Sequence, residues 1–539
     1  MTHSRNFPTS TQYFPDLIKH NAVYVDKTQF ILPLIEKEYN SNYFLSRPRR
    51  FGKSLFLSTL EHVFLGEKEL FKGLYIYDKI EWEGYPVIRL SIDRIGFADI
   101  GLPNALLRAV QKVGEINDIT LKDTSASLAF LELIEKLYEK HQKQVVILVD
   151  EYDKPILQYI EKDDMQQAMT NRDILKSFYS VLKDSGKYLR FVFLTGVSKF
   201  SKVSIFSDLN YFTDLTLSDD FNGICGFTEA EIRQYCYGGL EDLAAKEKIE
   251  IEAVVDKMRY WYNGFSWNAR EFVYNPYSTM RLMDSLTFAN YWFESGTPSF
   301  LIRLMNKTYY YEIKDVKVQS SIYDWYDLEN LNAISIMLQT GYLTFKKHIV
   351  DNFYIVNYPN KEVEMAFSEM LLGGYVHKHP SFVSVTILDI EEAFKKHDLE
   401  RVIKILKDMF GTLPSHFFTK PKETIDAQGN VKIAYKAVGE SFYHAIIYLI
   451  FNILGVRMSV EVTTQEGRID AVVETDNHIY IFEFKKDRKA QSAIKQIVDN
   501  NYPQRFALSK KPIFLMGVAF TLQKKGISDY VITPFPIPV

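Results

Sequence analysis

Three short apolar stretches in the first 200 residues predict neighbouring strands of one sheet. They run from Asn42 to Ser46, from Val145 to Val149 and from Leu189 to Leu194. The second stretch is an unbroken apolar run and the third is mostly apolar, which is typical of parallel strands that are buried on both faces. The helix-like segment LFLSTLEHVFLG follows the first stretch after a polar loop. Strands that alternate with helices build parallel sheets covered by helices, so the pattern predicts an α/β domain.

A second alternating region lies near the C-terminus. Two strands are predicted from Ile469 to Val473 and from Ile479 to Phe484, and the polar turn Thr475 to Asn477 separates them. Helix-like runs flank these strands, from Gly439 to Leu454 and from Ala490 to Asn500. Helices around paired strands predict a further α/β domain at this end of the chain.

The region between these two domains is predicted to hold a helical lid and a connecting part. From Gly226 to about Tyr291 the pattern is aromatic and helical. From Leu328 a helix-like run leads into the strands TFKKHIV and NFYIVNYP, the order of a winged helix, which either contacts DNA or only bridges domains. Thr419 to Lys432 is the best linker, because it contains Pro421 and Gly429. We therefore expect four domains, at residues 1–225, 226–300, 301–432 and 433–539.

Composition indicates a large globular protein. The chain has 539 residues, and its hydrophobic content of 47% excludes a disordered protein. Its formal net charge of −4 argues neither for nor against a nucleic-acid partner. Cys225 and Cys236 are too few for a disulfide framework or a four-ligand zinc site. The N-terminus lacks the apolar core of a signal peptide, and no apolar stretch is long enough to span a bilayer. We expect a cytoplasmic protein with no membrane partner.

The C-terminal strands carry residues suited to metal-dependent cleavage of phosphodiester bonds. Asp470 and Glu483 fall on adjacent predicted strands, and Lys485 shares a strand face with Glu483 because side chains alternate. Two carboxylates suit Mg²⁺ or Mn²⁺, and the lysine could orient or deprotonate the attacking water. The basic cluster of Lys485, Lys486, Arg488 and Lys489 lies where a phosphate backbone would pass.

This arrangement resembles the PD-(D/E)XK nuclease superfamily, in which an acidic residue on one strand precedes an E-x-K on the next. The resemblance implies that Asp470 and Glu483 bind metal and that Lys485 is catalytic. It also implies a further metal-side carboxylate at Glu440 and a supporting glutamine at Gln496 on the following helix.

The loop after the first predicted strand is a Walker A sequence with one departure. RPRRFGKS begins with Arg47 where the G-x-x-x-x-G-K-[ST] pattern has glycine. Gly52 allows close backbone approach, Lys53 can reach the β- and γ-phosphates, and Ser54 can bind Mg²⁺. The predicted nucleotide-binding residues are Arg49, Arg50, Phe51, Gly52, Lys53, Ser54, Leu55 and Thr195.

The second apolar stretch ends in two acids, as a Walker B motif does. Asp150 would hold Mg²⁺ together with Ser54, and Glu151 would polarise the attacking water. Thr195 ends the third stretch and either senses the γ-phosphate or caps the strand. We therefore predict a P-loop NTPase fold that binds ATP and Mg²⁺.

Strings along most of the chain resemble the bacterial AAA-ATPase-like family, whose members commonly end in a PD-(D/E)XK nuclease domain. The strings are YVDKT, RPRRFGKS, VDEYDKP, FLTGVSKFS, GFTEAEI and WYNGF. The resemblance implies an AAA-like ATPase module, a helical lid, a connecting region and the nuclease-like domain. An arginine-rich P-loop without the first glycine is typical of this family.

Two functional hypotheses follow. In the first, an ATPase controls a Mg²⁺-dependent nuclease that cleaves nucleic acid, and DNA is the expected partner. In the second, the protein is a nucleotide-dependent switch or remodeller whose nuclease-like domain only binds nucleic acid or a protein partner. A homo-oligomer stays open under both hypotheses, because an arginine finger can come from a neighbouring subunit.

Overall fold

The computed structural model describes most of the chain as two compact units. The described residues are 6–36, 41–162, 164–199, 212–292, 299–308, 313–324, 332–376, 378–411, 419–425, 431–437, 440–457, 459–462, 471–506, 508–521 and 526–536. The first unit comprises Met1–Leu301 and Ile313–Val363, and the second comprises Ile302–Glu312 and Glu364–Val539. The finer division into four domains stays a prediction.

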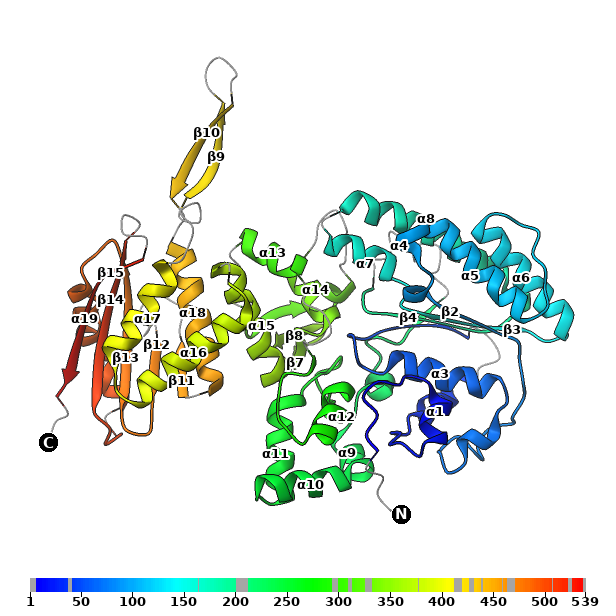
Figure 1. The fold of residues 1–539 in the computed structure, drawn as a ribbon, viewed down its shortest axis with the longest axis horizontal. Coiled ribbons are helices and arrows are strands. Elements are labelled where there is room, and N and C mark those ends of the chain that lie inside the picture. Colours follow the sequence, from blue (N-terminus) through cyan, green and yellow to red (C-terminus); the bar gives the residue numbers. More distant parts are fainter. Residues whose placement is uncertain are drawn as a thin grey trace. The chain divides into compact units, whose positions relative to one another are not determined.

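A five-stranded parallel sheet forms the centre of the first unit, as the apolar stretches predict (Figure 1). All residues of β3 are buried, which explains the unbroken apolar run. In the sheet, β4 lies between β1 and β3. The strands that lead to the Walker A loop, to the Walker B acids and to Thr195 therefore end at the same edge. The order is β2 (Val87–Ser91), β3 (Val145–Asp150), β4 (Leu189–Gly196), β1 (Asn42–Ser46) and β5 (Thr213–Asp214).

Helices cover both faces of this sheet. Figure 1 shows α1 and α3 on one side and α5, α6, α7 and α8 on the other. Amphipathic helices bury one stripe against a sheet, and in α5 this stripe includes Ala105, Leu106 and Val110. The helices are α1 (Phe14–Lys19), α2 (Leu32–Ile35), α3 (Lys53–Phe64), α4 (Phe97–Ile100), α5 (Leu102–Ile116), α6 (Ala126–His141), α7 (Lys154–Glu161) and α8 (Met165–Asp184).

The predicted lid segment is helical and has its own core. Its helices are α9 (Glu229–Tyr235), α10 (Tyr237–Glu247), α11 (Ile251–Tyr262) and α12 (Pro276–Ser285). Their buried faces meet around Leu240, Met258 and Tyr274, and Phe7 and Val25 from the N-terminal segment join the same cluster. The lid therefore packs directly against residues that precede the first strand.

The connecting part has the predicted helix-then-hairpin order. Helix α14 (Ala333–Thr340) precedes β7 (Thr344–Val350) and β8 (Phe353–Asn357). A third strand, β6 (Val316–Gln319), pairs with β8 and completes an antiparallel sheet in the order β6-β8-β7. These elements belong to the first unit.

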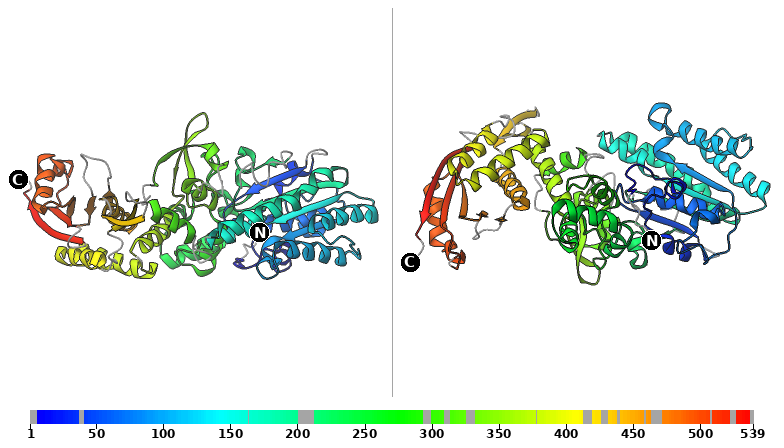
Figure 2. Two further views of the ribbon diagram at one scale, coloured as in Figure 1. Left: turned by 90° about the horizontal axis from the view of Figure 1, so that it is seen from above. Right: turned by 60° about the horizontal axis from the view of Figure 1, so that its bottom comes forward.

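The second unit has a mixed five-stranded sheet, as expected for its α/β pattern. Strands β13 and β14 are parallel, and the other neighbours are antiparallel. Helix α19 packs against β13 and β14 (Figure 2). A Cβ atom added to Gly517 in β14 would lie 2.5 Å from the carbonyl oxygen of Ala490, so this close approach requires glycine. The order is β11 (Ser459–Val462), β12 (Ala471–Glu474), β13 (Ile479–Lys486), β14 (Ile513–Thr521) and β15 (Gly526–Phe535).

Further helices and one hairpin complete the second unit. The predicted flanking helices are present as α18 (Glu440–Arg457) and α19 (Ala490–Asp499). The segment expected to be a linker, Thr419–Lys432, instead contains β9 (Thr419–Ile425) and the start of β10 (Val431–Ala437), and these two strands pair antiparallel. None of the helices in the described ranges combines the length and apolar character that a membrane crossing requires. The other helices are α13 (Ser299–Thr308), α15 (Lys361–Val376), α16 (Pro380–Lys395) and α17 (Leu399–Gly411).

Candidate functional site

The Walker A loop joins β1 to α3 through a tight turn. Its left-handed backbone positions are Arg50, with φ of 67°, and Gly52, with φ of 88°. Gly52 is the residue before the first turn of α3, so glycine meets a conformational requirement there. Arg50 and Gly52 make the turn, and the first position of the pattern can therefore be an arginine.

Arg47 fixes the loop from inside the protein. Its guanidinium is fully buried and donates hydrogen bonds to the carbonyl oxygens of Ser46 (2.9 Å), Thr216 (2.9 Å) and Phe221 (3.0 Å). It also lies 3.8 Å from the ring centre of Trp267. Burial lowers the pKa of Arg47 to about 10, which still leaves it charged at neutral pH. Arg47 is thus a structural residue of the loop.

Lys53 and Ser54 bring the Walker A and Walker B segments together. The buried Nζ of Lys53 donates to the carbonyl oxygens of Arg47 (2.9 Å) and Pro48 (3.0 Å). The Ser54 side chain lies near the carboxyl group of Asp150 and favours its charged form. Burial raises the pKa of Asp150, while the nearby Ser54 hydroxyl and the Lys53 charge oppose this rise. A hydroxyl and a carboxylate beside an ammonium group are a donor set that fits a Mg²⁺-bound phosphate.

Glu151 lies among acidic residues at the same edge of the sheet. It has a left-handed backbone, with φ of 50°. Burial and the nearby Glu151 charge raise the pKa of Asp93. Asp93 follows β2, and sequence reasoning missed it, although an acid after an apolar strand run was a usable signal. Asp150 at the end of β3, Glu151 after it and Asp93 after β2 therefore share one electrostatic neighbourhood.

Asp153 is a second functional candidate that sequence reasoning missed. Its buried Oδ2 accepts hydrogen bonds from the backbone N–H groups of Val197 (3.0 Å) and Ser198 (2.6 Å). Burial raises its pKa to about 6. A Cβ atom at Gly196 would lie 2.5 Å from Asp153 Oδ1, so the approach of these two segments depends on glycine. Asp153 thereby ties the Walker B segment to the end of β4.

Thr195 occupies the predicted position at the end of β4. Its hydroxyl group is buried and donates to the carbonyl oxygen of Leu45 in the neighbouring strand β1 at 2.8 Å. This bond suits the strand-cap alternative. A sensor role stays a prediction and would require the hydroxyl to leave Leu45.

Aromatic side chains from the lid segment surround the loop. Phe51 is buried and packs edge-on against Phe265 and Trp267, with ring centres 4.7 and 5.6 Å apart. The Arg50 guanidinium lies 3.9 Å from the ring centre of Tyr277. The Trp292 indole N–H donates to the carbonyl oxygen of Arg49 at 3.2 Å. These aromatic residues thus belong to the surroundings of the P-loop, and Tyr277 also packs against the lid core.

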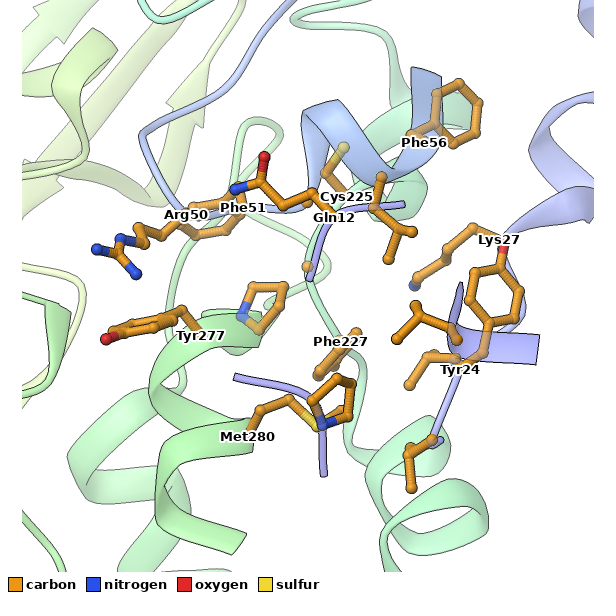
Figure 3. A pocket seen from close by; sticks show the side chains of 18 of the residues that line it. Gln12, Tyr24, Lys27, Arg50, Phe51, Phe56, Cys225, Phe227, Tyr277 and Met280 are labelled. Atoms are coloured by element: carbon orange, nitrogen blue, oxygen red, sulfur yellow. The ribbon is translucent and has the colours of Figure 1, made fainter. Parts of the chain in front are cut away.

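A cavity of about 400 Å³ opens beside the loop. Figure 3 shows Arg50 and Tyr277 on one side of it and Tyr24 and Lys27 on the other. This volume lies in the range of small-molecule sites. Of the predicted nucleotide-binding residues, Arg50, Phe51, Gly52 and Leu55 line this cavity, whereas Arg49, Lys53, Ser54 and Thr195 are not among its lining residues. The segments Pro8–Gln12 and Ile224–Phe227 also line it and were not predicted. Its lining also includes Tyr24, Lys27, Cys225, Phe227, Tyr277 and Met280.

The E-x-K pair lies on β13 in the second unit. Lys485 Nζ is 2.6 Å from Glu483 Oε1, and the Glu483 side chain is only 2% exposed. On the opposite strand face, Phe482 and Phe484 pack against Phe451, with ring centres 5.0 and 6.0 Å away. The predicted alternation is confirmed: the two polar side chains contact one another, and the aromatic ones enter the core.

The remaining predicted nuclease residues are only partly described. Asp470 lies outside the described residues, and Glu440 begins α18 with its side chain outside them. Gln496 is half-buried on α19. In the described ranges, no three His, Cys, Asp or Glu side chains form a metal-binding group. The metal ligand set therefore stays a prediction, and the Glu483–Lys485 pair is its structurally described part.

Comparison with known proteins matches both ends of the chain. A family described as "Predicted AAA-ATPase" matches residues 8–206, and the "PD-(D/E)XK nuclease superfamily" matches residues 438–529. A relative from Azotobacter chroococcum mcd 1, named "Uncharacterized protein in vnfD 5'region", is 33% identical over 528 residues, which cover 94% of this chain and 95% of the relative. No solved structure matches the chain. The chain therefore belongs to the family of this relative and has an AAA-ATPase-like domain followed by a C-terminal PD-(D/E)XK nuclease superfamily domain.

Proposed function

We propose that the protein binds ATP with Mg²⁺ in its first unit and that this binding controls a Mg²⁺-dependent nuclease in its second unit, with DNA as the substrate. The observation that carries the proposal is that β1 and β3 end at the same edge of the parallel sheet, which places Ser54 and the buried Lys53 near the buried Asp150. A cavity large enough for a nucleoside is lined by Gly52 and Leu55, the residues that flank Lys53 and Ser54 in the sequence.

In the ATP site, each residue has a role that its chemistry supports. Lys53 would exchange its two carbonyl partners for phosphate oxygens, and the N-terminus of α3 favours an anion. Ser54 and Asp150 would hold Mg²⁺, which neutralises phosphate charge when bound. Glu151 would polarise the attacking water. Arg49 and Arg50 remain the candidates for additional phosphate contacts.

In the nuclease site, Glu483 and Asp470 would hold the metal ion, with Glu440 as a further ligand. The metal, Mg²⁺ or Mn²⁺, would polarise the phosphate and lower the pKa of bound water. Lys485 would hold the attacking water or accept its proton, and Gln496 would support the site. Lys486, Arg488 and Lys489 follow the pair and supply positive charge for a phosphate backbone.

One observation favours the second hypothesis. In that hypothesis the protein is a nucleotide-dependent switch or remodeller, and its nuclease-like domain only binds nucleic acid or a protein partner. Glu483 Oε1 already has an ion-pair partner in Lys485 at 2.6 Å. Such a pair could serve structure alone. It is, however, nearly inaccessible to solvent, and a buried ion pair is weak evidence of stabilisation.

The test is cleavage of linear, circular and single-stranded DNA and of RNA, with Mg²⁺ or Mn²⁺ and with or without ATP. We expect ATP-dependent cutting of DNA that disappears in Asp470→Ala. Asp476→Ala, an exposed acid in the turn between β12 and β13, is the matched control. Cutting that persists in Asp470→Ala would overturn the site assignment. ATP binding without cutting of any substrate would favour the switch.

A further inference from the structure

Glu362 is a fully buried carboxylate outside both proposed catalytic sites. Its Oε1 accepts hydrogen bonds from the backbone N–H groups of Tyr291 (2.7 Å) and Trp292 (2.9 Å). The Ser278 hydroxyl donates to the same carboxylate, at 3.0 Å from Oε1 and 2.9 Å from Oε2. A buried carboxylate is costly unless it is hydrogen-bonded, and these donors offset that cost.

Both segments held by Glu362 touch the nucleotide site. One segment contains Trp292. Its backbone N–H donates to Glu362, and its indole N–H donates to the carbonyl oxygen of Arg49 in the P-loop. The other is α12, which carries Ser278 and also Tyr277, the residue that stacks on Arg50. Tyr277 and Met280 of α12 line the cavity beside the loop (Figure 3). Two short routes of direct contact thus lead from the P-loop to one carboxylate.

Glu362 is also the second residue of α15 (Lys361–Val376). A carboxylate in the first turn of a helix is stabilised by the helix dipole. The division between the two units falls inside this helix, between Val363 and Glu364. The first turn of α15 is therefore fixed by the nucleotide-site segments, and the rest of the same helix belongs to the second unit. Because a helix is a rigid element, a change at its first turn is passed along its length.

We propose that Glu362 is a positioning residue that connects nucleotide binding to α15. Through hydrogen bonds to Ser278, Tyr291 and Trp292 it sets the position of the lid segments that contact the P-loop, and through its own helix it carries their state to the second unit. This proposal rests on the proposed binding of ATP. It adds the route by which the ATP site controls the nuclease unit.

Hydrogen exchange of the full-length protein tests the connection without relying on cleavage. Amide exchange is measured for P-loop residues 48–54 and for α15, with and without the non-hydrolysable β,γ-imido analogue of ATP and Mg²⁺. In the unaltered protein we expect the nucleotide to protect both segments. In Glu362→Ala at saturating nucleotide, the P-loop should stay protected while the response of α15 is lost.

Conservative variants separate positioning from general damage. In Glu362→Gln, the amide oxygen can accept both backbone bonds and the amide NH₂ can donate to Ser278, so the response of α15 should be retained. Ser278→Ala removes one donor and should reduce the response, and it serves as the second test if Glu362→Ala does not fold. Glu364→Gln, two residues further along α15, is the matched control and should respond like the unaltered protein.

The possible results lead to different conclusions. An unchanged α15 response in Glu362→Ala, or in Ser278→Ala if the first variant does not fold, would show that Glu362 is not the connection. A Glu362→Gln response as weak as that of Glu362→Ala would rule out positioning by these hydrogen bonds. If the P-loop of the unaltered protein gains no protection at any nucleotide concentration, the ATP-binding proposal itself fails. Protection of the P-loop without any response in α15 overturns only the further inference.

Discussion

The two candidate sites of this protein are built in opposite ways. The E-x-K pair consists of two side chains on one strand, and β-strand alternation alone places Lys485 against Glu483. The P-loop is local in sequence but depends on distant segments: Arg47 is held by Thr216, Phe221 and Trp267. When one side chain changes, a site made by local strand alternation should lose catalytic activity and keep its stability. A site held by distant contacts should lose stability as well.

The largest effect is expected from the nuclease pair. Glu483→Gln keeps the size of the side chain and removes the charge that would bind metal. Metal ions contribute several kcal/mol to the transition state, so cleavage should fall by about a thousandfold. Rates of DNA cleavage in Mg²⁺ measure this loss, and nucleotide affinity in the first unit should not change.

Glu474→Gln provides the matched control for this variant. Glu474 also makes a strand-borne ion pair, with Lys511 at 2.7 Å, but it is not in the E-x-K motif. It should cut DNA at the unaltered rate. Equal losses in the two variants would mean that general damage to the sheet, rather than the metal site, explains the effect.

The P-loop should respond structurally to Arg47→Gly, although this change restores the Walker A glycine. The variant removes three buried hydrogen bonds and leaves a cavity under Trp267. We expect the free energy of unfolding to fall by about 3 kcal/mol. The measurement is the midpoint of thermal unfolding of the first unit, identified as the transition that ATP moves to a higher temperature. Arg270→Gly, at an exposed arginine, should change this midpoint little. An unchanged midpoint in Arg47→Gly would contradict the structural role.

This contrast also explains what the sequence could predict. Buried strands such as β3 follow from contiguous patterns, and the structure confirms them. The residues of both motifs are predicted from equally local patterns. The role of Arg47 depends on partners about 170 residues away in the chain, and no local pattern shows them. The cavity has the same origin, because the N-terminal segment and the lid supply much of its lining.

The smaller errors have local causes. The linker prediction at Thr419–Lys432 followed Pro421 and Gly429, but β9 includes Pro421 and pairs with β10. Proline is tolerated in edge strands, and both strands of a two-stranded sheet are edges. Asp153 was overlooked because the two acids before it already completed the Walker B pattern.

Lys53→Ala should weaken nucleotide binding with little loss of structure. The lysine is buried and donates only to two loop carbonyls in the described contacts. A hydrogen bond from a charged group is worth roughly 1.5–3 kcal/mol, so the dissociation constant for ATP should rise roughly 10- to 100-fold. Equilibrium binding of a fluorescent ATP analogue measures it. The exposed Lys72→Ala is the control, and unchanged affinity in Lys53→Ala would remove this lysine from the site.

The smallest expected effect is a pH dependence of stability from Asp153. Its folded-state pKa of about 6 lies above the ordinary aspartate value of 3.8 because of burial. The folded protein therefore binds this proton more tightly than the unfolded chain does, and stability contributed by this group falls as pH rises between those two values. From pH 5 to pH 7 the loss should be about 1 kcal/mol.

Asp153→Asn tests this pH dependence, because its amide oxygen can still accept from Val197 and Ser198 but cannot ionise. The variant should lose less stability than the unaltered protein between pH 5 and pH 7, as measured by the midpoint of the ATP-shifted thermal transition. Asp118→Asn, at an exposed position with left-handed backbone that asparagine tolerates, should retain the original pH dependence. Identical profiles for Asp153→Asn and the unaltered protein would mean that Asp153 stays ionised throughout this range. The hydrogen bonds from Val197 and Ser198 to Asp153 would then be independent of pH in this range. The stability of the P-loop site would depend on where its distant contacts lie and not on their protonation.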